Sequence, residues 1–267
     1  MLPAGYLEER VDFDRERYRR QVRLEGIGEE GQRRIRQASV LVAGCGGLGS
    51  VAAMLLARAG VGRLVLADRD VVERTNLNRQ VLYDDADAGT PKATLAARRL
   101  QAANPDVRCE AVVATLDRTN VPGLVDGVDL VVDGADNYDL RFVLNEACVR
   151  AGRPFVSGAA VGTYGVQFTV LPGVTACYAC VVDEAPAPGS WPTCETAGIL
   201  GTVSALVATL QATEALKVLA GREDQVRRTL WAIDPWAGTH AEVALERRTD
   251  GDGCPVCVQR RFDRLNK

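Results

Sequence analysis

One stretch of sequence, SVLVAGCGGLGSVAAMLLARAGVGRLVLAD, limits what this chain can fold into. It runs from Ser39 to Asp68 and opens on an apolar run at 40–43, which is typical of a strand buried on both faces. The motif Gly-x-Gly-x-x-Gly follows directly, and a helical segment at 50–59 comes next. A second apolar run at 64–67 ends in an aspartate. The stretch therefore predicts a β-α-β unit with an acidic residue about twenty positions beyond the glycines.

The glycine-rich turn predicts a binding site for the phosphates of a nucleotide. Its glycines are Gly44, Gly46, Gly47 and Gly49. Side chains here would keep a phosphate away from the backbone N–H groups that open the helix. Asp68 is placed to accept hydrogen bonds from a ribose. A tight turn without a ligand is the alternative for the motif alone, but strand, helix, strand and acid in this order favour a nucleotide.

The size and charge of the chain fit one soluble α/β domain with additions. Of the 267 residues, 39–267 are expected to form this domain, and 1–38 a helical segment before it, rich in Arg and Glu. The formal net charge of -3 gives no basic signature for nucleic acid. The charged N-terminus is not a secretory signal, and the apolar stretch 199–220 contains too many polar residues for a membrane span. We therefore expect a cytoplasmic protein that binds neither membranes nor nucleic acid directly.

Two Cys-x-x-Cys pairs predict a structural zinc site. The pairs are Cys177 with Cys180 and Cys254 with Cys257, and thiols of a cytoplasmic protein stay reduced. Four thiolates complete a tetrahedral zinc shell and leave no open position for catalysis. A redox pair is the alternative for either motif alone, but neither sits at the start of a helix in a thioredoxin-like context. The metal would tie the C-terminal part to a proline-rich crossover loop at about 181–197.

Outside these motifs, His240 and Cys194 are the side chains to consider for nucleophilic catalysis. His240 is the single histidine, and its position near the C-terminus, outside every motif, favours a surface residue. Cys194 lies in the crossover loop just before a helix, and a helix N-terminus lowers a thiol pKa. From the residues alone, a reactive thiol and an ordinary loop cysteine are equally supported.

Charged side chains follow the predicted strands on polar loops. Arg79 follows the ribose acid, Lys92 opens a helix at 92–103, and Asp136 follows a third apolar strand at 130–132. A doubly wound sheet brings all three to one carboxyl edge. Two cations and a carboxylate suit phosphate transfer, with Asp136 holding Mg²⁺, and exceed what hydride transfer needs. Further strands are expected at 107–113, 155–161, 165–171, 229–233 and 242–245, and further helices at 140–151 and 199–220.

The motifs together resemble the ubiquitin-activating-enzyme-like adenylyltransferases, the ThiF, MoeB and HesA family. Besides the features above, the resemblance rests on the segments Arg17-Tyr18-Arg19-Arg20-Gln21 and Asn76-Leu77-Asn78-Arg79-Gln80, and it runs from about 17 to 257. It implies a doubly wound, mostly parallel Rossmann-like sheet extended by antiparallel strands, with structural zinc and a homodimeric assembly. Bacterial enzymes that activate sulfur carriers for molybdopterin or thiamine synthesis would be the closest relatives.

The resemblance also implies a reaction and a set of site residues. The reaction is adenylation, with ATP and Mg²⁺, of the C-terminal Gly-Gly carboxylate of a small ubiquitin-like sulfur carrier protein, of molybdopterin, thiamine or tRNA-thiolation type. Pyrophosphate is released, and a separate donor protein then supplies sulfur for a thiocarboxylate. The implied catalytic residues are Arg20 from the partner subunit, Arg79, Lys92, Asp136 and Cys194. The implied nucleotide site comprises the four glycines with Asp68, Asp70, Asn76, Arg79, Gln80, Lys92, Asp136 and Asn137.

Two other functions remain as alternatives. An NAD-dependent oxidoreductase would share the glycine-rich motif, but the chain offers no catalytic histidine near the site and no separate substrate domain. A non-catalytic subunit of a heterodimeric activating enzyme would share the fold, but it would not need Arg79, Lys92 and Asp136 together. Within the family, a tRNA-modifying dehydratase also uses ATP, and the four-thiolate site favours the sulfur-carrier branch.

Overall fold

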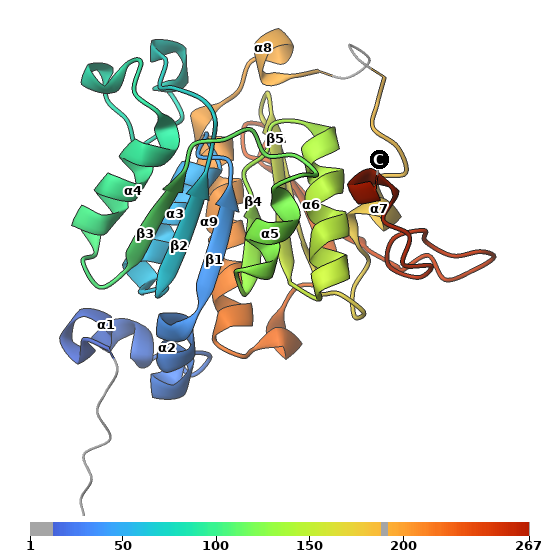
Figure 1. The fold of residues 1–267 in the computed structure, drawn as a ribbon, viewed down its shortest axis with the longest axis horizontal. Helices are drawn as coiled ribbons and strands as arrows, with labels where there is room; N and C mark the ends of the chain where they lie inside the picture. Colours follow the sequence, from blue (N-terminus) through green and yellow to red (C-terminus); the bar gives the residue numbers. More distant parts are fainter. Residues whose placement is uncertain (1–12, 188–191, 267) are drawn as a thin grey trace, which may run out of the picture.

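The computed structural model of the chain describes residues 13–187 and 192–266, and an eight-stranded sheet lies at its centre (Figure 1). The strand order is β3-β2-β1-β4-β5-β6-β7-β8. The five parallel strands are β1 (Ser39–Ala43), β2 (Arg63–Ala67), β3 (Arg108–Val112), β4 (Leu130–Asp133) and β5 (Phe155–Val161). The antiparallel extension consists of β6 (Tyr164–Val170), β7 (Thr229–Asp234) and β8 (Thr239–Ala244). The predicted doubly wound sheet with antiparallel additions is confirmed.

The chain reverses its direction of winding at β1. It moves outward through β2 to β3 and then returns to place β4 on the other side of β1. In doubly wound sheets, ligands bind at the carboxyl ends of the strands at such a reversal. The sheet edge at the carboxyl ends of β1 and β4 is called the crevice below. The glycine-rich turn follows β1 and the turn with Asp136 follows β4, so both border this crevice.

Helices cover both faces of the sheet. On one face lie α3 (Gly49–Ala59), α4 (Lys92–Ala103) and α9 (Gly201–Leu219), with α2 (Gly28–Gln37) at its end. On the other face lie α5 (Val121–Asp126), α6 (Tyr138–Ala151), α7 (Tyr178–Val181) and α10 (Asp263–Asn266). The remaining elements are α1 (Arg15–Val22), the one-turn helix α8 (Cys194–Ala197) and short 3₁₀ turns η1 (Arg74–Asn76), η2 (Asp85–Asp87) and η3 (Glu223–Gln225). Among the described residues, no helix is long and apolar enough to cross a membrane.

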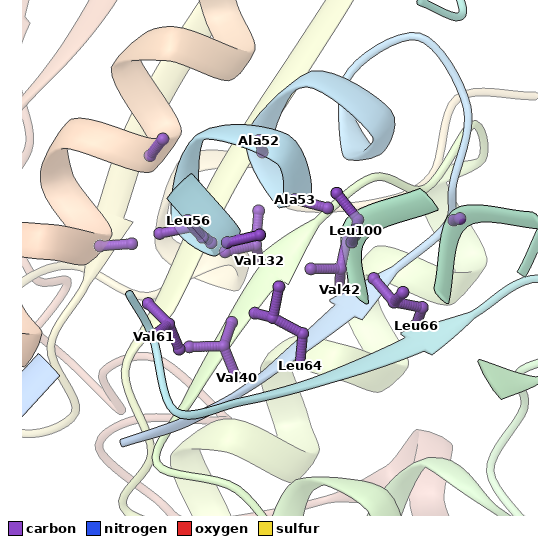
Figure 2. Close-up of a cluster of buried hydrophobic side chains, with 14 of the residues drawn as sticks. Val40, Val42, Ala52, Ala53, Leu56, Val61, Leu64, Leu66, Leu100 and Val132 are labelled. Atoms are coloured by element: carbon purple, nitrogen blue, oxygen red, sulfur yellow. The ribbon is translucent and has the colours of Figure 1, made fainter. Parts of the chain in front are cut away.

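Strand β1 is apolar throughout because both of its faces are covered. Val40 and Val42 pack with Leu56 of α3 under one helical layer (Figure 2), whereas Leu41 and Ala43 belong to the core of the other layer. Fully burying a valine or leucine side chain stabilises the folded state by about 1.5–3 kcal/mol. The short apolar run is therefore enough to fix the central strand.

Most predicted elements are present, with differences at their ends and in the crossover segment. Gly60 caps α3 in the left-handed conformation (φ 86°), as its position after the helix suggests. Helix α6 begins before the predicted residue 140, because Asn137 caps it with its Oδ1 on the backbone N–H of Leu140. The prediction of a crossover loop at about 181–197 was wrong at its C-terminal end, where α8 lies, and α7 ends at its first residue. Residues 1–12 of the expected helical segment and 188–191 of the expected loop lie outside the described residues.

His240 lies exposed on the edge strand β8, away from the carboxyl ends of β1 and β4. The prediction that this histidine is a surface residue is confirmed.

Candidate nucleotide site and metal centre

Two glycines of the turn after β1 are required by backbone packing. Gly44 has φ 101°, and a Cβ atom there would lie 2.4 Å from the carbonyl oxygen of Gly134 in the turn after β4. A Cβ atom on Gly49 would lie 1.8 Å from the carbonyl oxygen of Gly44. These glycines bring the two turns together at the crevice, and larger residues would force them apart.

The two middle glycines have a different surrounding. A Cβ atom on Gly46 would meet Gln80 Nε2 at 3.6 Å, and one on Gly47 would meet Arg79 Cγ at 3.4 Å. Both glycines are partly exposed and face side chains rather than backbone, and Gly47 also faces Ser204 of α9 at 3.4 Å. The turn is therefore open toward the loop that carries the predicted phosphate-binding residues, which fits a phosphate against the N-terminus of α3.

Asp68 follows β2 with its carboxylate held in place. Its Oδ2 accepts from the backbone N–H of Cys45 and its Oδ1 from that of Asp70, both at 2.7 Å. Burial raises the pKa of this carboxyl group, while the two backbone N–H groups and Lys92 oppose that shift. The carboxylate is thus oriented beside the glycine-rich turn, where a ribose acid is expected.

Lys92 is the first residue of α4, and its side chain is only 6% exposed. Its Nζ lies 3.3 Å from Asp70 Oδ2. Asp70 thus holds the cation at the same sheet edge as Asp68. The Lys92 ammonium group and the Asp70 carboxylate thus place one positive and one negative charge side by side at this edge.

Arg79 and Gln80 lie on the polar loop after η1. Arg79 Nη1 donates to the backbone oxygen of Thr75 and to Asn78 Oδ1, each at 3.0 Å. Gln80 is buried, and within the described part of the chain its Oε1 has no hydrogen-bond partner. Asn76, which accepts the backbone N–H groups of both residues through its own carbonyl, is partly exposed. The loop therefore brings a guanidinium group and an unpaired amide oxygen close to Gly46 and Gly47.

Asp136 lies on the turn between β4 and α6 and is exposed. Its Oδ1 accepts a 3.0 Å hydrogen bond from Nδ2 of Asn137, whose own Oδ1 caps α6. Its carboxylate is thus free to bind a cation at the crevice, and the N-cap ties the turn to the helix.

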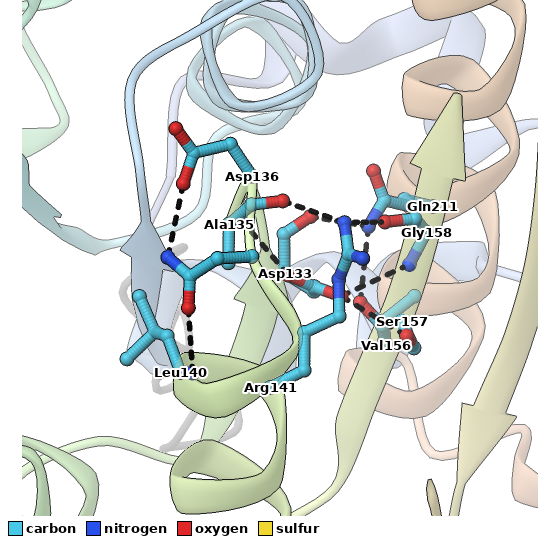
Figure 3. Close-up of polar contacts among 10 residues, drawn as sticks. Asp133, Ala135, Asp136, Leu140, Arg141, Val156, Ser157, Gly158 and Gln211 are labelled. Atoms are coloured by element: carbon cyan, nitrogen blue, oxygen red, sulfur yellow. Dashed lines mark hydrogen bonds and ion pairs between the residues drawn. The ribbon is translucent and has the colours of Figure 1, made fainter. Parts of the chain in front are cut away.

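A buried ion pair beneath this turn was not predicted. The carboxylate of Asp133 is fully buried and lies 3.1 Å from Arg141 Nε (Figure 3). Burial raises the pKa of Asp133, and Arg141 counteracts this shift. Burial would lower the pKa of Arg141, and the charge of Asp133 raises it, so each group of the pair counteracts the effect of burial on the other. In the sequence, Asp133 is only an aspartate at the end of an apolar strand, and no local pattern links it to Arg141 of α6.

Cys194 is the first residue of α8 and is exposed, with its Sγ 3.7 Å from the backbone oxygen of Ala160. Desolvation by the surrounding protein raises the pKa of this thiol, and Arg79 lowers it. The N-terminus of α8 does little to favour a thiolate, because this helix has only four residues and a small dipole. The reactivity of Cys194 stays a prediction. The thiol does share the crevice with Arg79 and Asp136, whose charges act on its pKa.

Arg20 lies on α1, exposed, at the far end of the sheet. Gln21 beside it donates from Nε2 to the backbone oxygen of Ala59, at the C-terminal end of α3. Because the glycine-rich turn precedes the N-terminal end of α3, the length of this helix separates Arg20 from the turn within one chain (Figure 1). An action of Arg20 at the nucleotide site therefore has to come from another subunit.

The four cysteines of the two pairs form one cluster that can hold a metal ion. Sulfur–sulfur distances are 3.7 Å for Cys177 with Cys254, 3.5 Å for Cys180 with Cys257, and 4.0 Å for Cys177 with Cys180. A tetrahedral zinc ion with Zn–S bonds of about 2.3 Å requires sulfurs about 3.8 Å apart, so the cluster fits zinc. Hydrogen bonds from Cys177 and Cys257 lower the pKa of Cys180 and favour a thiolate.

The Cys254→Ser variant is expected to lose the metal and to be less stable by more than about 2 kcal/mol, because a structural metal contributes its binding energy to folding. Elemental analysis should find one zinc ion per wild-type chain and less in the variant, with a lower melting temperature. Cys109→Ser, a change in a half-buried cysteine of β3 outside the cluster, is the control. Wild-type protein purified without chelator and found free of metal would contradict the zinc assignment.

Taken together, the fold and the site define a doubly wound α/β protein in which the glycine-rich turn and the side chains of Asp68, Lys92, Arg79 and Asp136 lie at one sheet edge. The chain belongs to the ThiF family, whose family model matches residues 18–256. The predicted family is thereby confirmed.

Named relatives cover nearly the whole chain. The chain is 43% identical to the SAMP-activating enzyme E1 of Haloferax volcanii, over 94% of this chain and 91% of that protein. It is 41% identical to the sulfur carrier protein adenylyltransferase of Thermus thermophilus, over 91% and 90% of the two chains. The crystal structure of E. coli MccB with ATP is similar in fold, with a TM-score of 0.79 and 25% identity over 90% of this chain and 74% of that one.

Proposed function

We propose that this nucleotidyltransferase adenylates the C-terminal Gly-Gly carboxylate of a small ubiquitin-like sulfur carrier protein with ATP and Mg²⁺. The observation that carries the proposal is the meeting of Asp68, Lys92, Arg79 and Asp136 around the glycine-rich turn. The carrier carboxylate forms a bond to the α-phosphorus of ATP, the bond to the β-phosphate oxygen breaks, and pyrophosphate leaves. The names of the Haloferax and Thermus relatives support a carrier of this kind.

Each residue at the crevice has its own role in binding ATP and Mg²⁺. Asp68 accepts the ribose hydroxyls, and Arg79 and Lys92 bind the triphosphate, where their charge compensates that of the leaving pyrophosphate. Asp136 would hold Mg²⁺, which when bound neutralises phosphate charge. The half-exposed glycines bring backbone N–H groups to the phosphates. Asp70, Asn76, Gln80 and Asn137 complete the site, Asp70 by holding Lys92 and Asn137 by holding the turn with Asp136.

Exchange of radiolabelled pyrophosphate into ATP tests this function. We expect exchange with a carrier that ends in a free Gly-Gly and none with a carrier lacking these two residues. The carboxylate is the nucleophile, and two glycines pass through a narrow channel with little hindrance. Exchange that is equally fast without the Gly-Gly tail would contradict the proposal. An oxidoreductase would instead enhance NADH fluorescence on binding, and a non-catalytic subunit would show neither signal.

Arg20 is proposed to act across a homodimer, with α1, which precedes the proposed domain 39–267, delivering it to the partner's crevice. A guanidinium group there compensates charge on the departing pyrophosphate. Arg20→Ala and Asp136→Ala chains should each be inactive, and mixing them after subunit exchange should restore one complete site per heterodimer. Mixed dimers that stay inactive despite proven subunit exchange would contradict an action in trans.

Cys194 is proposed to act after adenylation, by one of two routes. Its thiol attacks the acyl adenylate, AMP leaves, and sulfide then displaces the thiol from the resulting thioester to give the thiocarboxylate. Alternatively, the donor's persulfide displaces AMP to form an acyl disulfide, and Cys194 attacks the donor's sulfur, which releases the carrier as a thiocarboxylate and leaves Cys194 in a disulfide with the donor. A separate persulfide-carrying donor protein supplies the sulfur. Cys194→Ser should therefore keep pyrophosphate exchange near the wild-type rate and slow formation of the carrier thiocarboxylate, measured by mass spectrometry. If the variant forms the carrier thiocarboxylate at the wild-type rate, both with sulfide and with a protein persulfide donor, Cys194 has no role in sulfur transfer.

A further inference from the structure

We propose that Arg141 and Gln211 are positioning residues for the carboxylate of Asp136 and thereby set the affinity of the site for its divalent cation. The inference rests on the proposed function in one respect, the assignment of Asp136 as the metal ligand. Neither residue belongs to the motifs described above, and both are buried.

Ala135, the residue before Asp136, is hydrogen-bonded through both its backbone N–H and its carbonyl oxygen. These bonds to Asp133 and Arg141, with the bonds of Gln211 to the same strand, are called the clamp below. The N–H of Ala135 donates to Asp133 Oδ1 at 2.9 Å, and the carbonyl oxygen of Ala135 accepts from Arg141 Nη2 at 2.6 Å (Figure 3). Asp133 and Arg141 are themselves ion-paired at 3.1 Å. The residue before Asp136 is therefore held by a buried unit that spans β4 and α6.

Gln211 ties the same unit to α9. Its Nε2 donates to the carbonyl oxygen of Asp133 at 2.7 Å and to that of Val156 at 3.1 Å. Strands β4 and β5 pair at Val132 with Val156, and beyond this pair the amide of Gln211 bridges the two strands. Gly158 makes room for it, because a Cβ atom there would lie 2.6 Å from Gln211 Cδ.

Strand β5 completes the enclosure of the Asp133 carboxylate. Ser157 Oγ donates to Asp133 Oδ2 at 3.0 Å, and the backbone N–H of Gly158 approaches the same oxygen at 3.4 Å. The carboxylate thus has partners from its own turn, from α6 and from β5. The whole arrangement is buried, whereas Asp136 at its upper edge is exposed.

Asp136 depends on this clamp because its own side chain has little else to hold it. Within the described residues, the Asp136 carboxylate accepts one side-chain hydrogen bond, from its neighbour Asn137. A metal ligand must be oriented by the groups behind it, and changing such groups typically costs 10–100-fold in metal affinity or activity. Here those groups act through the backbone of Ala135 rather than through the carboxylate.

The test compares wild type with Arg141→Lys and Gln211→Met, two replacements of similar length that remove hydrogen bonds of the clamp. Gln167→Met is the matched control: this glutamine is also buried and pairs through its backbone with Gly158, but its side-chain Nε2 donates to Thr169 Oγ1 on β6 and not to Asp133, Ala135 or Val156. Binding of Mn²⁺, as a spectroscopic substitute for Mg²⁺, is titrated by electron paramagnetic resonance with a non-hydrolysable ATP analogue present. The Mg²⁺ dependence of pyrophosphate exchange is measured in parallel.

We expect Mn²⁺ to bind about tenfold or more weakly to Arg141→Lys and Gln211→Met. Their exchange rates should recover at high Mg²⁺, and Gln167→Met should match wild type in both measurements. Wild-type Mn²⁺ affinity in the two folded variants would overturn the inference, as would equal weakening in Gln167→Met. If the wild-type protein shows no pyrophosphate exchange, the proposed function is contradicted. The Mn²⁺ titration does not depend on exchange and therefore tests the positioning role separately.

Discussion

Asp136→Ala is expected to lower carrier-dependent pyrophosphate exchange by at least about 100-fold, because a bound metal contributes several kcal/mol of charge stabilisation in such transfers. The same change should leave the free energy of unfolding within about 0.5 kcal/mol of wild type, since exposed side chains away from special contacts contribute little. Asp136 is exposed and accepts a hydrogen bond from its neighbour Asn137. A large loss of activity at constant stability would separate a ligand from a structural residue.

Asp139→Ala is the control for this experiment. Asp139 is an exposed aspartate in the first turn of α6 and pairs with Arg264 on α10, at 2.9 Å. It should retain exchange, because its carboxylate faces the C-terminal helix instead of the crevice. Near-normal turnover in Asp136→Ala would show that the metal assignment is wrong.

Asp133→Asn is expected to destabilise the fold by about 3–5 kcal/mol, the range found when one partner of a buried ion pair is removed. Asp133 is fully buried and Arg141 nearly so. The guanidinium group that remains cannot lose its proton, so it stays charged without a counter-ion. Urea denaturation at neutral pH measures the loss. A change below about 1 kcal/mol would show that the pair is not desolvated as the structure indicates.

Arg141→Met is expected to behave differently from Asp133→Asn, because a carboxyl group can take up a proton. Burial already raises the pKa of Asp133, and removing Arg141 takes away the main opposing charge. The folded variant then binds a proton more readily than the unfolded chain. Its stability should be greatest below the unfolded pKa, about 3.9, and should be lost as the pH rises through the raised folded value. Asp133→Asn should lack this part of the pH dependence.

Features that depend on local spacing could be predicted from the sequence. The glycine-rich turn, its flanking strands and Asp68 follow one another within a single β-α-β unit, and each Cys-x-x-Cys pair is a local pattern. The charges of Arg79, Lys92 and Asp136 could be placed at one edge because Arg79 and Asp136 lie on polar loops that follow predicted strands and Lys92 opens a predicted helix. The confirmed architecture then brings these loops together at the carboxyl ends of the strands.

The clamp beneath Asp136 could not be predicted, since its contacts join distant parts of the chain. Gln211 bonds the backbone of Asp133 across 78 positions, and nothing in the apolar pattern of α9 distinguishes this glutamine. The helices α7 and α8 have four residues each, too few for a periodic pattern. The raised pKa of Cys194 comes from desolvation, which depends on tertiary neighbours rather than on its place before a helix.

The central claim is that this chain joins AMP to a carrier through its terminal carboxylate, and mass spectrometry of the carrier tests it most directly. Carrier incubated briefly with the enzyme, ATP and Mg²⁺, without a sulfur donor, should gain the mass of an adenylate on its C-terminal glycine. The gain should be absent with Asp136→Ala and with a carrier whose tail lacks Gly-Gly. A carrier that stays unmodified with wild-type enzyme, or is adenylated without its Gly-Gly tail, would contradict the claim.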